Sequence, residues 1–291
     1  MSDSVTIASE RLSASVAALG AETQSLTLEG RGELLWGGDP AWWSGRAPIL
    51  FPMVGGAPGD TVAFDGATYP MAKHGFARRS TFVLEEAGPD WCRHVLTDSD
   101  ETRAAYPFAF RLAVTHALEG ATLTVTAEVG SPGEVPLPFG FGFHPAFRWP
   151  LPGAEGQPHR VVLENGAEPP LARLGADGLL APARLPSPFS AGVLTLDPAL
   201  FEADAMIFPE GAGTALRLEA DGQGVPALRF AFENTPHLGI WQKPGAPYIC
   251  IEPWHGMAAE EGAGPEMTAR PGTVTLAPGD SIRFGFSVSA S

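Results

Sequence analysis

Apolar and polar side chains alternate through residues 110–129, which read FRLAVTHALEGATLTVTAEV. In the first half, one face takes five side chains: Phe110, Leu112, Val114, His116 and Leu118. In the second half, leucine and valine alternate with threonine. A period of two residues is that of a β-strand, and the Glu119-Gly120 turn joins the two halves. The segment therefore predicts an antiparallel hairpin with one buried face.

The same period recurs along the chain. Residues 228–233 and 282–288 alternate in the same way, and Asp65-Gly66 separates two further short runs as a hairpin turn does. The strongest helix signal is brief, from Ser99 to Tyr106, with Ser99 as the N-cap. Strands at intervals of about 8–12 residues are typical of a sandwich or barrel. Because we find no composition shift and no internal repeat, we predict one domain over residues 1–291, an all-β, large antiparallel β-sandwich with few short helices.

Composition narrows the classes of function. The chain is 44% hydrophobic and 18% charged, which favours a globular protein with a sizeable core. Its formal net charge of −15 repels phosphate backbones, so we expect no nucleic-acid partner. The two cysteines do not make a disulfide framework. The first residues do not resemble a basic leader peptide, and no run approaches the roughly 18 apolar residues of a membrane span. We therefore expect a cytoplasmic protein without a membrane partner.

One apolar segment ends on a histidine. Residues 139–145 read Phe-Gly-Phe-Gly-Phe-His-Pro, so the phenylalanines share one face and Gly140, Gly142 and His144 share the other. Glycine has no side chain, and we expect open space beside the imidazole. Proline cannot donate to a strand ladder, so the strand should end near His144.

A second apolar segment carries an acid. Residues 248–254 read Tyr-Ile-Cys-Ile-Glu-Pro-Trp, which puts the isoleucines on the core face and Tyr248, Cys250 and Glu252 on the other. Burying an unpaired carboxylate costs several kcal/mol, so Glu252 needs a partner. Taken singly, a strand histidine or a lone acid is more often structural than catalytic, and these two segments leave both interpretations open.

Three more segments set polar residues in apolar runs: residues 46–55 with Arg46, residues 73–79 with His74 and Arg78, and residues 200–208 with Asp204. Asp204 fits a turn equally well. Together with the two strand ends, these segments resemble the aldose 1-epimerase (galactose mutarotase) superfamily, in its bacterial branch. Five motifs carry the resemblance, in this order: Arg46-Ala-Pro-Ile-Leu-Phe-Pro52, His74-Gly-Phe-Ala-Arg78, Phe143-His144-Pro-Ala-Phe147, Asp204-Ala-Met-Ile-Phe208 and Ile251-Glu252-Pro-Trp254.

The resemblance spans nearly the whole chain and implies a β-sandwich whose concave face holds a sugar. By position in the motifs, His144 matches the general acid and Glu252 the general base. His74 and Asp204 match sugar-binding residues, and Arg78 matches the arginine that closes its motif. Trp254 is a candidate to stack on the apolar face of a sugar, or else a core residue.

The chain departs from the family pattern at one position. Many relatives have an arginine directly after the Phe-Pro-x-Val-Gly element, where this sequence has Gly56. Arg46 or Arg78 is expected to supply that charge instead.

These assignments predict interconversion of the two anomers of a free hexose. A cyclic aldose is a hemiacetal, so the bond from C1 to the ring oxygen must break while a base takes the anomeric proton and an acid protonates the ring oxygen. The resemblance implies no metal, nucleotide or other cofactor, and a sugar as the only small-molecule partner of a monomer or homodimer. We expect His144 and Glu252 to line opposite sides of one small hollow.

Three alternatives stay open at the sequence level. A sugar-phosphate (hexose-6-phosphate) 1-epimerase would need a cationic pocket, for which Arg46, Arg78 and Arg79 are candidates. A non-catalytic sugar sensor on the same fold would not need both His144 and Glu252. A metal site would combine His74, His144 and Glu252, which are ligand types that suit zinc or iron.

Overall fold

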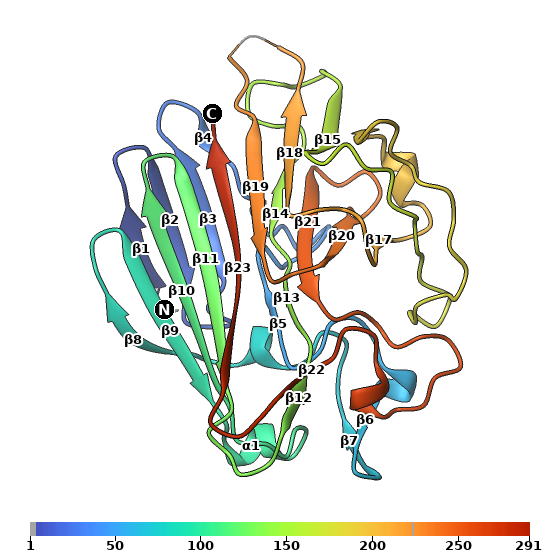
Figure 1. The fold of residues 1–291 in the computed structure, drawn as a ribbon. Coiled ribbons are helices and arrows are strands. Elements are labelled where there is room, and N and C mark those ends of the chain that lie inside the picture. Colours follow the sequence, from blue (N-terminus) through green and yellow to red (C-terminus); the bar gives the residue numbers. More distant parts are fainter. Residues whose placement is uncertain (1–3, 223) are drawn as a thin grey trace.

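The computed structural model describes residues 4–222 and 224–291, and strands dominate it (Figure 1). The longest sheet has nine strands in the order β16-β15-β18-β19-β23-β11-β10-β9-β8. Their bounds in chain order are β8 Val83–Ala87, β9 Trp91–Thr97, β10 Arg111–Glu119, β11 Thr122–Gly130, β15 His159–Leu163, β16 Val193–Thr195, β18 Ala215–Ala220, β19 Leu228–Glu233 and β23 Ser281–Ala290. The predicted hairpin is confirmed as β10 and β11, with Leu118 opposite Leu123.

Two smaller sheets accompany it. The six-stranded sheet runs β17-β20-β21-β13-β5, with β14 also paired to β21. Its bounds are β5 Ile49–Leu50, β13 Phe141–Phe143, β14 Ala146–Arg148, β17 Met206–Phe208, β20 His237–Trp241 and β21 Tyr248–His255. The four-stranded sheet, β1 Ser4–Ala8, β2 Leu12–Ala17, β3 Thr23–Leu28 and β4 Gly32–Glu33, lies beside β9 and β10. The strand pairs are antiparallel, which confirms the predicted all-β antiparallel fold.

The remaining elements are short. There are two two-stranded sheets. In one, β6 Thr61–Phe64 and β7 Ala67–Pro70 form a hairpin around the predicted Asp65-Gly66 turn; in the other, β12 Leu137–Phe139 pairs with β22 Val274–Leu276, which is distant in the sequence. Single 3-10 turns are η1 Pro58–Asp60, η2 Ala77–Arg79, η3 Pro198–Phe201 and η4 Met267–Ala269. None of the helices in the described ranges has the length and apolar character needed to cross a membrane.

The helix α1, Asp100–Arg103, is shorter than the predicted span from Ser99 to Tyr106. Its start is as expected, because the Ser99 hydroxyl accepts a hydrogen bond from the backbone N–H of Thr102 at 3.2 Å. Its early end has a local cause. Pro107 has no N–H to donate to the carbonyl of Arg103 four residues earlier, so the helical hydrogen-bond ladder cannot continue there.

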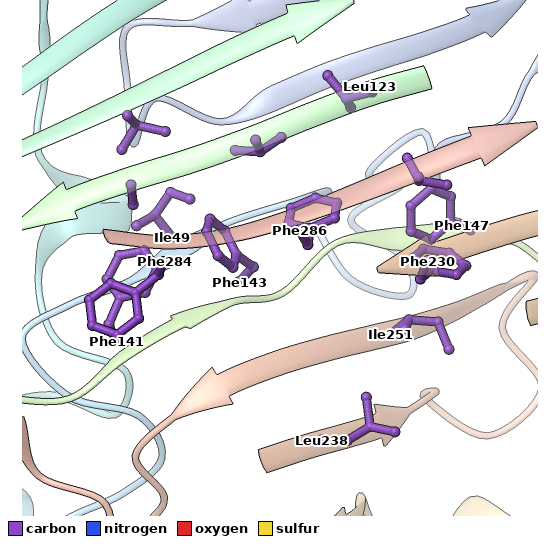
Figure 2. Packing of buried hydrophobic residues seen from close by; sticks show 14 of the residues in the cluster. Ile49, Leu123, Phe141, Phe143, Phe147, Phe230, Leu238, Ile251, Phe284 and Phe286 are labelled. Atoms are coloured by element: carbon purple, nitrogen blue, oxygen red, sulfur yellow. The ribbon is translucent and has the colours of Figure 1, made fainter. Parts of the chain in front are cut away.

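Aromatic packing joins the six-stranded sheet to the nine-stranded one (Figure 2). Phe141 on β13 stacks on Phe284 of β23, with ring centroids 4.8 Å apart, and Phe143 meets Phe286 at 5.0 Å. Full burial of such a side chain stabilises the fold by about 2–3 kcal/mol. The phenylalanine face predicted for residues 139–143 is therefore the core face.

The opposite face of the six-stranded sheet is where the polar residues emerge. Ile249 and Ile251 belong to the main core, whereas Cys250 and Glu252 alternate with them and point the other way, as predicted. Strand β13 ends at Phe143, so His144 leaves the ladder just before Pro145 and lies next to β21. One strand pair thus holds the core on one side and the candidate site on the other.

Candidate functional site

A cavity of about 240 Å³ opens on this polar face of the six-stranded sheet. Six of the seven side chains singled out in the sequence line it: His74, Arg78, His144, Asp204, Glu252 and Trp254. The other lining residues are Trp43, Val54, Gly55, Lys73, Leu174, Ala205, Ile207, Trp241 and Ala258. The fold therefore brings together segments that are up to about 200 residues apart in the sequence.

His144 and Glu252 meet at the base of the cavity. The Nε2 atom of His144 lies 3.1 Å from the Oε2 atom of Glu252. Both side chains are nearly enclosed, with 7% of His144 and 1% of Glu252 exposed. They therefore stand side by side, and the expectation that they line opposite sides of a hollow is wrong. The reason is register, because the chain after β13 runs directly alongside β21.

Burial acts on both ionisations. Burial, with smaller contributions from the charges of Arg78 and Lys73, lowers the pKa of His144 to about 3. Burial raises the pKa of Glu252, as does the charge of Asp204, while Lys73 pulls it down. The uncharged form of each group is thus favoured. The cation that opposes the effect of burial at Glu252 is Lys73.

His74 lies beside the pair, with its ring centroid 5.7 Å from that of His144. Its Nδ1 accepts a hydrogen bond from the backbone N–H of Gly55 at 3.1 Å. Burial lowers the pKa of His74 well below its ordinary value, so the ring is neutral. A neutral ring that accepts at Nδ1 carries its hydrogen on Nε2, which makes His74 a hydrogen-bond donor.

Asp204 and Arg78 occupy the rim. Asp204 lies between η3 and β17 in the left-handed region, with a φ of 62°, and its Oδ1 accepts from the backbone N–H of Ala205 at 2.8 Å. It is thus both a turn residue and a cavity residue. Arg78 in η2 is half-buried, and burial together with the charge of Arg79 lowers its pKa.

Trp254 fills the space that the sequence left open. A Cβ placed on Gly142 would lie 2.5 Å from the indole, and one on Gly239 also 2.5 Å from it. The two glycines flank Trp254 on β13 and β20, so the indole lies across the sheet between them. The expected gap beside the imidazole is therefore occupied, because β21 supplies a large side chain at that level. Trp254 both packs in a buried cluster and lines the cavity.

Arg46 is the predicted site residue that does not line the cavity. Its Nη1 donates to the Gln24 side chain at 2.6 Å, and its backbone N–H donates to the Glu22 carboxylate at 2.7 Å. Arg46 therefore organises the chain before β5. Lys73, which directly precedes the His74-to-Arg78 motif and was not among the predicted site residues, is a cation of the cavity.

Gly56 marks a local change in the wall of the cavity. A Cβ at this position would lie 3.2 Å from the carbonyl oxygen of Gly178 and 3.8 Å from the Leu179 side chain. A long side chain there would meet the loop around Gly178. That loop contributes Leu174 to the cavity.

Two aromatic residues of the site lie outside the five sequence motifs. Trp43 lies 5.0 Å from the His144 ring and Trp241 lies 5.8 Å from it. Trp241 follows Gly239 on the same face of β20, so alternation along residues 237–241 was the available signal. Trp43 lies in a loop, so no alternation of side chains indicates its position in the site.

Metal-ligand residues also cluster here, but in a different set from the one weighed in the sequence. His144, Cys250 and Glu252 each place a ligand atom within 4.8 Å of the others. His74 is not part of that group, and Cys250 replaces it.

Known proteins resemble this chain over nearly all of its length. A family model described as aldose 1-epimerase matches residues 3–168, more than half of the chain. Protein LacX of Lactococcus lactis subsp. lactis is 27% identical over 299 residues, covering 98% of both chains. Two crystal structures each reach a TM-score of 0.91. A galactose mutarotase related enzyme from Lactobacillus acidophilus is 29% identical, covering 99% of this chain and 97% of that one. A galactose mutarotase-like protein from Lactobacillus casei is 28% identical, covering 99% and 100%.

The structure thus has the galactose mutarotase-like fold. The matched family model and the shared architecture lead to one conclusion: this chain belongs to the aldose 1-epimerase family.

Proposed function

We propose that the protein interconverts the α and β anomers of a free hexose, with His144 and Glu252 as the proton-transfer pair. The observation that carries this proposal is the 3.1 Å contact between His144 Nε2 and Glu252 Oε2 at the base of a cavity. The two oxygens that exchange protons in mutarotation are both bonded to C1 of the sugar. An acid and a base that stand side by side can therefore reach both.

The pair needs one mobile proton, either as imidazolium with carboxylate or as imidazole with carboxylic acid. Burial favours the uncharged form, and moving its proton across the 3.1 Å contact gives the first form. From there, His144 protonates the ring oxygen while Glu252 takes the anomeric proton, and the ring opens. The aldehyde turns about the C1–C2 bond, and the groups act in reverse on the other face. Doubly protonated and fully deprotonated pairs are inactive, so kcat/KM should follow a bell-shaped pH profile.

The rest of the cavity supports binding of a sugar. His74 presents a donor and Asp204 lies at the rim as an acceptor, groups suited to hydroxyls. Trp43, Trp241 and Trp254 add apolar rings, which suit the C–H face of a pyranose.

Substitution of the base tests the proposal. Glu252→Gln keeps the shape of the side chain but removes its basicity, so the exchange rate should fall by about 10²–10⁴-fold. Saturation-transfer NMR on glucose and galactose measures the rate, and ligand titration should show largely retained sugar affinity. Glu233→Gln, in an exposed pair with Arg283, is the control and should leave the rate unchanged. A near-normal rate in Glu252→Gln would refute the assigned base, and saturable binding without any acceleration in the unaltered protein would indicate a sensor.

A 6-phosphorylated hexose is the second candidate substrate, because two cations, Lys73 and Arg78, line the cavity. Against it, Asp204 and Glu252 line the same cavity, and Arg46 does not. Comparing kcat/KM for glucose, galactose and their 6-phosphates separates the two substrate classes. A preference for the phosphates that disappears in Lys73→Met and in Arg78→Met would support the phosphate alternative.

A further inference from the structure

A thiol lies directly behind the proposed catalytic pair. Cys250 precedes Glu252 by two residues on β21, so both side chains leave the same face of the strand. His144 reaches them from the segment between β13 and β14. Its Nε2 or Nδ1, the Cys250 Sγ and a carboxylate oxygen of Glu252 all lie within 4.8 Å of one another. All three residues are buried.

We propose that His144, Cys250 and Glu252 form a binding site for a thiophilic divalent cation of the zinc type, and that its occupation inhibits the enzyme. The binding part stands on the geometry alone, whereas the inhibition rests on the proposed function.

The donor set selects the class of metal. Imidazole, thiolate and carboxylate are the three ligand types that zinc takes in proteins, and catalytic-type sites use three protein ligands and leave the fourth position open. Here the fourth position faces the cavity, since His144 and Glu252 line it. The sulfur disfavours magnesium and calcium, which prefer oxygen ligands.

Charge balance favours a dication. The thiolate of Cys250 and the carboxylate of Glu252 together carry two negative charges, so a bound dication leaves no net charge in a buried place. On binding, the thiol proton and the mobile proton of the His144–Glu252 pair leave to solvent. Lys73 and Arg78 line the same cavity and repel a cation, which moderates the affinity.

Inhibition follows from shared atoms. A cation held by His144 and Glu252 occupies the lone pairs that would exchange protons with a sugar. Metal and sugar therefore exclude each other, and added hexose should weaken apparent metal affinity.

Cobalt(II) is the probe for binding, because a thiolate–cobalt bond gives a near-ultraviolet charge-transfer band. The unaltered protein should show this band and saturate at one cation per chain, and Zn²⁺ should displace it. Cys250→Ser should lose the band and bind at least about 100-fold more weakly, since even outer-shell changes cost 10–100-fold. Cys92→Ser removes the other buried thiol, on β9, and is the matched control.

The outcomes are decisive in both directions. No band in the unaltered protein, or a band that persists in Cys250→Ser, overturns the site. A band lost in Cys92→Ser places the metal elsewhere and also overturns it. A Cys250→Ala variant, checked by circular dichroism, separates loss of a ligand from loss of fold.

Anomer exchange measured with Zn²⁺ tests the inhibition. Zn²⁺ should inhibit the unaltered protein and Cys92→Ser, whereas Cys250→Ser should stay active and resist. If no sugar is turned over at all, the proposed function fails, but the cobalt titration still decides the metal site. If exchange is present and insensitive to Zn²⁺, the inhibition is wrong while the proposed function stands.

Discussion

Lys73 carries a charge that acts on both members of the proton-transfer pair. Burial dominates both shifts, but Lys73 lowers the pKa of Glu252 and that of His144. Removing the charge in Lys73→Met raises both pKa values, so both limbs of the kcat/KM profile should move to higher pH. On the acid side, kcat/KM should fall about three- to tenfold, and on the basic side it should rise.

A charge-preserving variant is the control for this prediction. Lys73→Arg should keep both limbs in place. Because Lys73 is exposed, added salt should reduce the difference between the pH profiles of the unaltered protein and Lys73→Met. A uniform loss of kcat/KM with no change in pH dependence would instead assign Lys73 to contact with the substrate.

His74 is expected to bind and not to transfer protons. His74→Ala removes one donor to a sugar hydroxyl, so KM should rise about tenfold while kcat stays within about threefold. Steady-state exchange kinetics separate the two parameters. His255→Ala, whose ring contacts the Asn234 carbonyl, is the control. A loss in kcat as large as that of Glu252→Gln would place His74 in the proton-transfer step.

At the residue scale, the sequence motifs located the His144–Glu252 pair, but their contact depended on register between distant strands. Arg46 and Lys73 show the limit. Both sit in quoted motifs with equal charge, yet one donates to Gln24 and the other lines the cavity. Only the path of the backbone distinguishes them, and no local pattern encodes it.

Arg270, which follows η4, donates hydrogen bonds to the loop that carries Gly55. The Arg270 Nη2 donates to the carbonyl oxygens of Val54, Gly56 and Met257 at 2.9, 3.0 and 3.1 Å. Burial lowers its pKa to about 10, which still leaves it cationic at neutral pH. It therefore ties together two segments that line the cavity.

Arg270→Met should destabilise the protein by about 3 kcal/mol, because three buried carbonyls lose a charged donor. Urea unfolding followed by circular dichroism measures the free energy. Arg283→Met removes an exposed arginine paired with Glu233 and should cost less than about 1 kcal/mol. Equal losses in the two variants would mean that Arg270 does not clamp the loops.

At the element scale, alternation identified β10, β11, β19 and β23 because the period of a strand is local. The neighbours of each strand were not predictable. The space beside Gly142 was expected to be open, and the strand that pairs with it brings Trp254 there. The cross-strand partner of Gly142 is about 110 residues away in the sequence, and nothing in the segment around Gly142 indicates which residue it is.

Two buried histidines lie on neighbouring strands of the nine-stranded sheet, His94 on β9 and His116 on β10. His116 and His94 are each about 1% exposed, and their Nδ1 atoms find no hydrogen-bond partner within the described ranges. Burial lowers the pKa of His116 to about 3, with His94 adding to the effect. The folded state therefore resists protonation at a site that the unfolded chain protonates near pH 6.5.

The whole molecule should lose stability in acid for this reason. A lowered folded-state pKa contributes stability that is present above about pH 6.5 and is lost as the pH falls toward about 3, to the extent of a few kcal/mol. His116→Gln should flatten this dependence when urea unfolding is repeated across that range. A slope identical to that of the unaltered protein would show that other groups set the acid limit.

At the scale of the molecule, the all-β sandwich was predictable because period-two segments recur along the chain. His116 itself was placed on the core face by alternation, and the structure confirms it. The division into nine-, six- and four-stranded sheets was not predictable, since it depends on pairings such as β23 with β11 and β19.

The indole of Trp254, laid across two glycines, has an optical consequence. With Trp43 and Trp241 it surrounds the space where a sugar would sit, and its buried Nε1 finds no acceptor among the residues that the structure describes. A sugar in the cavity would displace water beside these rings and change the polarity around them. Binding should therefore change the protein's own tryptophan emission, so that occupancy can be followed without any attached dye.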